Sequence, residues 1–296
     1  MLTLDQKERR QAWGLMFPML FVMACITLYP LVRTIWLSFT DAALISNGMT
    51  PNWVGWDNFI YAMEDPDYMA AFVRSLWFTF VSVSLEGIIG VLVALLLNQK
   101  FYGRTLLRIL VILPWALPTI VNAMMWRLNF HPDYGSINSL LFQFGLIDGY
   151  QSWLGDPDSA LYCVAFADVW KNYPLVTLMV LAALQTIPDE LYEAARLDDA
   201  SAWLRFKSIT LPAIAPALAA VLALRTIDAF KIFDIIYAMT RGGPMDSTKT
   251  VSFFVYQESF SYLRAGSGAA YALLMTLVCS LLIVGYLYLL RRQQHH

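Results

Sequence analysis

Long apolar runs separated by short polar segments form the main pattern of this chain. Each run is long enough for a helix to cross a hydrocarbon core of about 30 Å, and none alternates with the period of two of a barrel strand. Only helices and closed barrels satisfy their backbone hydrogen bonds in lipid. The sequence therefore predicts an all-α integral membrane protein, a six-helix transmembrane bundle. The predicted spans cover residues 13–39, 73–98, 106–127, 161–186, 209–230 and 269–290.

The composition agrees with lipid as the main solvent. Charged residues make up 14% of the chain, against about 25% in a typical soluble domain. The net charge of −2 gives no reason to expect a nucleic-acid partner. Cys25, Cys163 and Cys279 lie inside apolar runs without ligand-like spacing. They are interpreted as buried apolar residues and not as a disulfide or metal site.

The distribution of lysine and arginine predicts the orientation in the membrane. The loops at 40–72 and 128–160 contain neither residue and carry acidic side chains instead. The positive-inside rule then places these loops outside and both termini in the cytoplasm. The first apolar run is too long for a signal-peptide core, so we expect a retained helix. Segment 231–268 carries four basic residues and fits the rule less well. It is predicted to be extracytoplasmic or to re-enter the protein.

The loop at 188–208 has the pattern of a short exposed helix, a turn and a second helix. Pro188 and Asp189 form a favourable helix start, and Ser201 is suited to cap the second helix. An interfacial helix resting on lipid is one alternative. The first helix is rich in carboxylates, however, and anionic inner-leaflet lipid would repel it. A protein partner with a basic or apolar groove is therefore favoured.

The same loop resembles the "EAA" loop of type I ATP-binding cassette (ABC) importer permeases. The matching positions are Glu193, Ala194, Ala195, Asp198, Ala200, Phe206, Ile209, Leu211, Pro212 and Pro216. In that family the loop is the coupling helix that docks on the ATP-hydrolysing subunit. The resemblance implies that the coupling residues here are Glu190, Glu193, Ala194, Ala195, Asp198, Asp199 and Ala200. The family's usual glycine falls at Asp199, where a left-handed turn would cost Asp about 1 kcal/mol.

Two further segments resemble the carbohydrate group of these permeases, such as the larger maltose permease subunit. One is Thr-Arg-Gly-Gly-Pro at residues 240–244, and the other is Trp-Lys-Asn-Tyr-Pro at residues 170–174. The resemblance implies a multi-pass protein of a bacterial or archaeal cytoplasmic membrane that carries a sugar or related polyol. It also implies an ATPase dimer that binds ATP and Mg, a second permease subunit and an extracytoplasmic sugar-binding protein. No cofactor is expected in this chain.

Charged residues at membrane depth are costly and need a reason. Arg225, Asp228, Lys231 and Asp234 alternate in sign at steps of three, so neighbours are expected to pair along one helix face. One interpretation is a structural ladder, and the other is a polar strip along a translocation cavity. The resemblance places substrate-contacting turns near Arg225, Ala229 and Ile232, and Asp228 lies among them.

The fourth span carries a second polar group. Asp168 and Lys171 are spaced for an ion pair, which is the structural alternative. Amides, charged groups and aromatic rings are also the chemistry that binds sugars, and Trp170, Asn172 and Tyr173 supply it. The substrate-pathway residues predicted in this span, with Asn172 and Leu175 implied by the resemblance, are Trp170, Lys171, Asn172, Tyr173 and Leu175.

Single polar residues and prolines in other spans add two expectations. Glu86 is predicted to make a buried helix–helix hydrogen bond rather than a ligand contact. Pro114 and Pro118 are predicted to kink the third span, either as a moving gate or as static bends.

Enzymatic activity is not expected from this sequence. No lysine follows a glycine, which excludes a phosphate loop of the Walker A type, and no nucleophile or metal-ligand motif is present. A secondary transporter coupled through Glu86 and Asp168 is one alternative function. A membrane enzyme or assembly factor is the other, and the sequence offers no set of residues for it.

Overall fold

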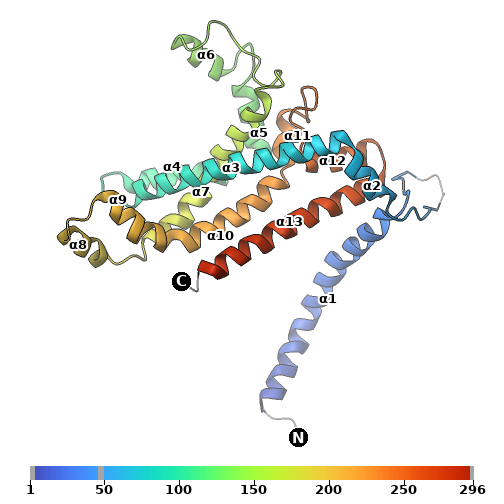
Figure 1. The fold of residues 1–296 in the computed structure, drawn as a ribbon, viewed down its shortest axis with the longest axis horizontal. Coiled ribbons are helices and arrows are strands. Elements are labelled where there is room, and N and C mark those ends of the chain that lie inside the picture. The colour runs from blue at the N-terminus through green and yellow to red at the C-terminus, as the bar shows by residue number, and fades with distance from the viewer. Residues whose placement is uncertain (1–3, 46–49, 294–296) are drawn as a thin grey trace. The chain divides into compact units, whose positions relative to one another are not determined.

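The computed structural model describes residues 4–45 and 50–293, and within these ranges the regular structure is helical apart from one bridge, between Thr40 and Trp53. The chain divides into two compact units. The first contains residues 1–65 and 255–274, and the second contains residues 66–254 and 275–296. Each unit is described by itself, and Figure 1 shows the course of the helices in both.

The first unit is built around α1 (Leu4–Ser38), whose segment Ala12–Ser38 is long and apolar enough to cross a membrane. After α1 the chain turns back, and Asn58 on α2 (Asp57–Glu64) donates to the carbonyls of Ser38 and Thr40, both at 2.9 Å. Side-chain and backbone hydrogen bonds from Asn52 lower the pKa of Asp41. The loop after the first span is thus tied down by polar contacts.

The second unit has α3 (Pro66–Asn98), α7 (Ala160–Leu184) and α10 (Leu211–Phe230) at its centre. These three helices pack against one another (Figure 1). Gly90 lets α3 approach α7 closely, because a Cβ at this position would lie 2.6 Å from the Cβ of Val176. Helix α3 begins at Pro66 and not at residue 73, so the preceding loop is shorter than the predicted segment 40–72.

The third predicted span, residues 106–127, is two helices and not one. Helix α4 (Arg104–Ala116) and α5 (Thr119–Asn129) meet at an angle of 96°. Leu117 and Pro118 at the break are extended. Proline lacks an N–H and disfavours helical backbone in the residue before it, which explains a break at Pro118. Pro114 remains inside α4, so only one of the two proline positions interrupts the span.

The remaining predicted spans differ from the observed helices mainly at their ends. Helix α7 turns by 72° into α8 (Asp189–Leu197). The predicted span 209–230 begins earlier, because α9 (Ala202–Arg205) and the π-helical turn η1 (Phe206–Thr210) continue directly into α10. The last helix, α13, covers Ala265–Gln293 and is longer than the predicted 269–290.

The long segment expected at 128–160 contains α6 (Ser136–Gln143). The segment expected at 231–268 contains α11 (Asp234–Met239), α12 (Val251–Tyr256) and the π-helical turn η2 (Gln257–Ser261). Helix α11 packs on α5 and α7 and buries Ile235, Ile236 and Met239. Its re-entry into a membrane stays a prediction.

The predicted fold class is confirmed. In the described part of the chain, four helices are long and apolar enough to span a membrane alone, and the two bent pairs raise the number to six. The six apolar runs of the sequence thus account for the helices that build the bundle.

Candidate functional site

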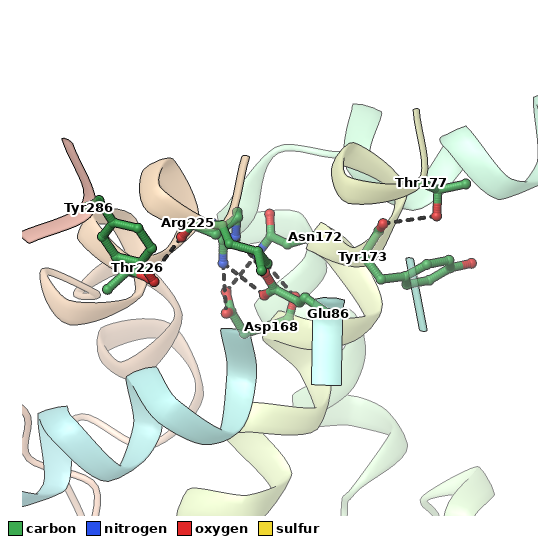
Figure 2. A network of polar contacts seen from close by, with 9 residues as sticks. Glu86, Asp168, Asn172, Tyr173, Thr177, Arg225, Thr226 and Tyr286 are labelled. Carbon is green, nitrogen blue, oxygen red and sulfur yellow. Dashed lines mark hydrogen bonds and ion pairs between the residues drawn. The ribbon is translucent and has the colours of Figure 1, made fainter. Parts of the chain in front are cut away.

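A buried ion cluster joins the three central helices of the second unit (Figure 2). Arg225 on α10 donates from Nε and Nη2 to the two carboxylate oxygens of Glu86 on α3, at 2.7 and 2.9 Å. Nη2 also donates to Oδ2 of Asp168 on α7, at 3.1 Å. One guanidinium is therefore shared by two carboxylates from two different helices.

The cluster is almost completely removed from solvent. Glu86 is 0% exposed, Asp168 is 4% exposed and Arg225 is 6% exposed. Burying an unpaired charge costs several kcal/mol, so paired geometry of this quality is needed for any of the three to remain ionised. The predicted helix–helix hydrogen bond of Glu86 is confirmed, with Arg225 as its partner.

The pairing predicted along residues 225–234 is confirmed only between Asp228 and Lys231. Arg225 pairs with Glu86 and Asp168 rather than with Asp228. The helix ends at Phe230, and Asp234 begins α11, so the four charges do not share one helix face. One predicted pair does form, between Lys231 and Asp228 at 3.0 Å, and both side chains are half exposed.

The Asp168 carboxylate makes its direct contacts with Arg225 and Asn172 and not with Lys171, its partner in the structural alternative. Its Oδ2 accepts from Arg225, and its Oδ1 accepts from Nδ2 of Asn172 at 2.8 Å. Nδ2 also donates to the backbone carbonyl of Asp168 at 3.0 Å. Asn172, one helical turn further along α7, is thus tied to the cluster (Figure 2).

A cavity of about 500 Å³ lies beside this cluster in the second unit. Its wall is polar and charged, with contributions from α7, from α10 and the segment after it, and from the break between α4 and α5. The lining residues are Trp115, Thr119, Asp168, Lys171, Asn172, Leu175, Arg225, Asp228, Lys231, Ile232, Phe233, Asp234 and Ile235.

The cavity brings together most of the residues predicted for a substrate pathway. Those that line it are Lys171, Asn172, Leu175, Arg225, Asp228 and Ile232. The other three do not line it: Trp170 packs edge-on against Trp126, with ring centroids 5.5 Å apart, Ala229 is fully buried and Tyr173 is half-buried.

Two lining residues at the helix break were missed by sequence reasoning. Trp115 and Thr119 flank the extended residues between α4 and α5 and face the same cavity as Asn172. The signal that could have found them is Pro118, because a broken helix in a membrane exposes backbone that needs a polar cavity or protein around it.

A larger cavity, of about 800 Å³, has a different character. It lies along α3, α10 and α13 and is lined mainly by aliphatic side chains, among them Leu76, Val83, Leu218 and Leu282. Groups able to bind a hydroxyl-rich solute are scarce there, so the smaller polar cavity is the candidate substrate site.

Helix α8 has no buried residue, and its leucines are exposed on the surface of this chain. Leu191 is 50% exposed and Leu197 is 87% exposed. The predicted coupling residues Glu190, Glu193 and Ala194 are exposed too. An exposed helix with apolar and acidic side chains has the properties of a surface that is covered by a partner.

The end of α8 is a Schellman turn. The N–H of Ala200 donates to the carbonyl of Ala195 at 2.9 Å, and the N–H of Asp199 donates to the carbonyl of Arg196 at 3.1 Å. Asp199 adopts a left-handed φ of 53°, the conformation for which glycine is favoured. The predicted start at Asp189 and the predicted cap by Ser201, which accepts from the N–H of Leu204 at 3.2 Å, are both confirmed.

One side chain connects α8 to the start of the α10 region. The hydroxyls of Tyr192 and Thr210 are 2.9 Å apart and share a hydrogen bond. Thr210 is buried and ends the π-helical turn η1, which continues into α10 and so toward Arg225. One hydrogen bond therefore joins the exposed helix α8 to the helical segment that carries Arg225 of the buried cluster.

Comparison with known proteins places the chain in a family. The sequence model of the protein family described as "binding-protein-dependent transport system inner membrane component" matches residues 87–295. The chain therefore belongs to this family, the membrane permeases of ABC importers, and the family is not enzymatic.

Three curated relatives match almost the whole chain. The trehalose/maltose transport system permease protein MalF of Thermococcus litoralis is 40% identical over 286 residues, 95% of this chain and 94% of the relative. The sulfoquinovosyl glycerol transport system permease protein SmoG of Agrobacterium fabrum is 34% identical over 97% of this chain and 92% of the relative. The trehalose transport system permease protein SugA of Mycobacterium tuberculosis is 34% identical over 90% and 84%. The resemblance to carbohydrate ABC importer permeases is thus confirmed.

A solved structure confirms the fold. A permease chain of a bacterial ABC transporter that imports the acidic polysaccharide alginate superposes with a TM-score of 0.83 at 22% identity, covering 97% of each chain. The type I importer architecture predicted from the sequence is therefore the observed one. Membership in this family also excludes the secondary-transporter alternative, and both carboxylates on which that alternative rested are occupied by Arg225.

Proposed function

We propose that this chain is the sugar-conducting permease subunit of an ABC importer and moves its substrate into the cytoplasm by alternating access. The observation that carries this proposal is the polar cavity of about 500 Å³ that is lined by α7, by α10 with the segment after it, and by the break between α4 and α5. Small-molecule sites commonly have volumes of about 300–1,000 Å³ and a few oriented polar groups on the wall.

The chemistry of the wall favours an uncharged, hydroxyl-rich solute. Its charged side chains are balanced, with the acidic Asp168, Asp228 and Asp234 opposed by three basic residues. The Asn172 amide and the rings of Trp115 and Phe233 also line the wall. These groups fit a sugar, which presents hydroxyls at its edge and apolar faces to aromatic rings. Relatives named for trehalose and maltose support the same class.

Coupling to ATP hydrolysis is assigned to α8. Its exposed leucines and carboxylates would lie in a groove of a separate ATPase subunit, as an amphipathic helix does in a helix-in-groove interface. That subunit would bind ATP and Mg, and this chain would need no cofactor. With α8 in the cytoplasm, both termini are cytoplasmic, in agreement with the lysine and arginine distribution.

The complete importer would contain further subunits. A second permease, either a homologue or a copy of this chain, would supply the other half of the pathway, and an extracytoplasmic binding protein would deliver the sugar. A solved relative of the same fold is described in complex with an alginate pentasaccharide-bound periplasmic protein. Transport then requires that sugar and ATP each bind the outward and inward states with different affinity.

The test is ATP hydrolysis by the complex purified from native membranes and reconstituted with its binding protein. We expect trehalose or maltose to raise the hydrolysis rate, and we expect Glu193→Arg to release the ATPase while the permease stays folded. The matched control is Glu64→Arg, an equal charge reversal at an exposed position on α2. Recovery of no ATPase, or equal effects of the two variants, would contradict the assignment of α8.

A further inference from the structure

The two ends of the Asn172 side-chain amide have different roles in this structure. Both groups beside its nitrogen, Oδ1 of Asp168 at 2.8 Å and the Asp168 carbonyl at 3.0 Å, can only accept hydrogen bonds. The nitrogen must therefore face Asp168, because the opposite orientation would bring three acceptors together. In Figure 2 the amide oxygen is turned away from the Asp168 carboxylate.

The oxygen of this amide is the part that remains for a ligand. Asn172 is 7% exposed and lines the polar cavity, and within the part of the chain that the structure describes no donor is bonded to its Oδ1. An amide oxygen on a largely buried side chain that faces a cavity without a donor gains from a solute that provides one.

The orientation of Asn172 depends on residues further from the cavity. Asp168 holds the amide nitrogen with Oδ1, and its own Oδ2 is held by Arg225. Arg225 is in turn held by the bidentate contact with Glu86, which does not line the cavity. A series of fixed groups therefore runs from α3 through α10 to α7 and ends at the amide.

We propose that Glu86, Arg225 and Asp168 are positioning residues that fix the Asn172 amide with Oδ1 toward the cavity, so that the transported sugar is recognised there by donation from one of its hydroxyls. This inference rests on the proposed sugar-permease function and adds the polarity of one recognition contact. Asn172 is a hydrogen-bond acceptor for the substrate, and a group that only accepts is rejected at that position.

The polarity can be tested with sugar analogues on the reconstituted complex. The probes are trehalose, its mono-deoxy analogues and its mono-deoxyfluoro analogues, with the maltose series used where only maltose is transported. Replacement of a hydroxyl by hydrogen removes donor and acceptor, whereas fluorine removes the donor and retains a weak acceptor. At one hydroxyl position we expect both analogues to raise the KM of uptake by about three- to tenfold, to a similar extent. In Asn172→Leu this dependence on that one position is expected to disappear.

The positioning role is tested with Asp168→Asn. This variant leaves Arg225 paired with Glu86. Arg225 claims the one side-chain oxygen of the new asparagine, so the NH2 of that asparagine faces the Asn172 amide and favours the opposite orientation, with Nδ2 toward the cavity. The KM for the parent sugar then rises, and the fluoro analogue becomes better than the deoxy analogue at the same position. The matched control is Thr177→Val, which removes a buried hydroxyl on α7 that donates to the Tyr173 carbonyl. The control is expected to leave the analogue pattern unchanged.

Three results would overturn the inference. One is a position where fluorine retains affinity in the parent protein and loses it in Asn172→Leu, which would make Asn172 a donor. Another is an analogue pattern that does not depend on Asn172, and the third is an effect of Asp168→Asn equal to that of Thr177→Val. The scan of the parent protein and Asn172→Leu decides the polarity even if Asp168→Asn does not assemble. If no sugar stimulates the complex at all, the proposed function fails as well, and this outcome is distinct from the first three.

Discussion

The carboxylates of the buried ion cluster and those of α8 have opposite environments. Glu86 and Asp168 are buried and shared by one guanidinium, whereas Glu190 and Glu193 are exposed on a helix that buries nothing. Among the described residues, neither of the two α8 glutamates forms an ion pair. The first pair of acids is satisfied inside this chain, and the second pair is available to another subunit.

This difference separates two kinds of functional residue. A buried charge must be held by its own protein, because the energetic cost of leaving it unpaired in the membrane interior is several kcal/mol. An exposed carboxylate costs nothing while it is solvated and gains orientation only when a partner binds. Fixed geometry is what a substrate cavity needs, and an open surface is what a docking helix needs.

The largest expected effect comes from removing the cation of the buried cluster. Arg225→Met leaves Glu86 and Asp168 buried without a cation, and we expect a loss of about 3–5 kcal/mol in stability. Lys231→Met is the matched control, because it removes a cation whose partner Asp228 is half exposed; its cost is expected to be about 0–1 kcal/mol. Thermal unfolding of the two purified variants in detergent measures the difference.

Neutralising the two carboxylates should restore most of the stability that Arg225→Met loses. A triple variant that adds Glu86→Gln and Asp168→Asn contains no buried charge in the cluster, and we expect it to unfold at a higher temperature than Arg225→Met alone. Equal unfolding temperatures for Arg225→Met and Lys231→Met would instead show that the cluster is solvated and that the comparison above is incorrect.

The sequence predicted the helices better than their contacts. The length and apolarity of the six runs are local properties, so the spans could be found without knowledge of the neighbours. The pairing of Arg225 could not, because Glu86 is 139 residues away and the register between α3 and α10 is set by packing. Nearest-neighbour spacing favoured Asp228, which pairs with Lys231 instead.

The site was predictable to the extent that its residues share one helix. Lys171, Asn172 and Leu175 lie on a single face of α7, and sequence and resemblance together identified them. Trp115 and Thr119 enter the cavity because the chain breaks by 96° between α4 and α5. A proline predicts a bend but not the direction of the helix that follows, so these contributions required the structure.

A smaller effect is expected from the contact that connects the two regions. Tyr192→Phe removes the hydrogen bond to Thr210, which is worth about 0.5–1.5 kcal/mol and leaves a buried hydroxyl without its partner. We expect the ATPase to remain bound while less sugar is transported per ATP hydrolysed, because α8 is no longer tied to the start of α10. The ratio of uptake to hydrolysis in proteoliposomes measures this coupling.

Two variants control this prediction. Tyr102→Phe makes the same chemical change at an exposed position and should leave the ratio unchanged. Thr210→Val combined with Tyr192→Phe should lower the ratio of uptake to hydrolysis no further than either change alone, because both changes remove the same hydrogen bond. Additive losses would indicate that the two hydroxyls act separately and that the Tyr192–Thr210 contact does not transmit motion.

The smallest effect is expected at the turn that ends α8. Asp199 has a φ of 53°, so Asp199→Gly should stabilise the Schellman turn by up to about 1 kcal/mol. Because α8 is exposed, the gain should appear as slower amide hydrogen exchange in residues 189–200 and not as a change in global unfolding. Asp198→Gly is the control, since φ is −85° there and glycine gains nothing. Faster exchange in Asp199→Gly than in the parent protein would mean that the aspartate side chain itself stabilises the turn, and that the departure from the family's glycine is compensated locally.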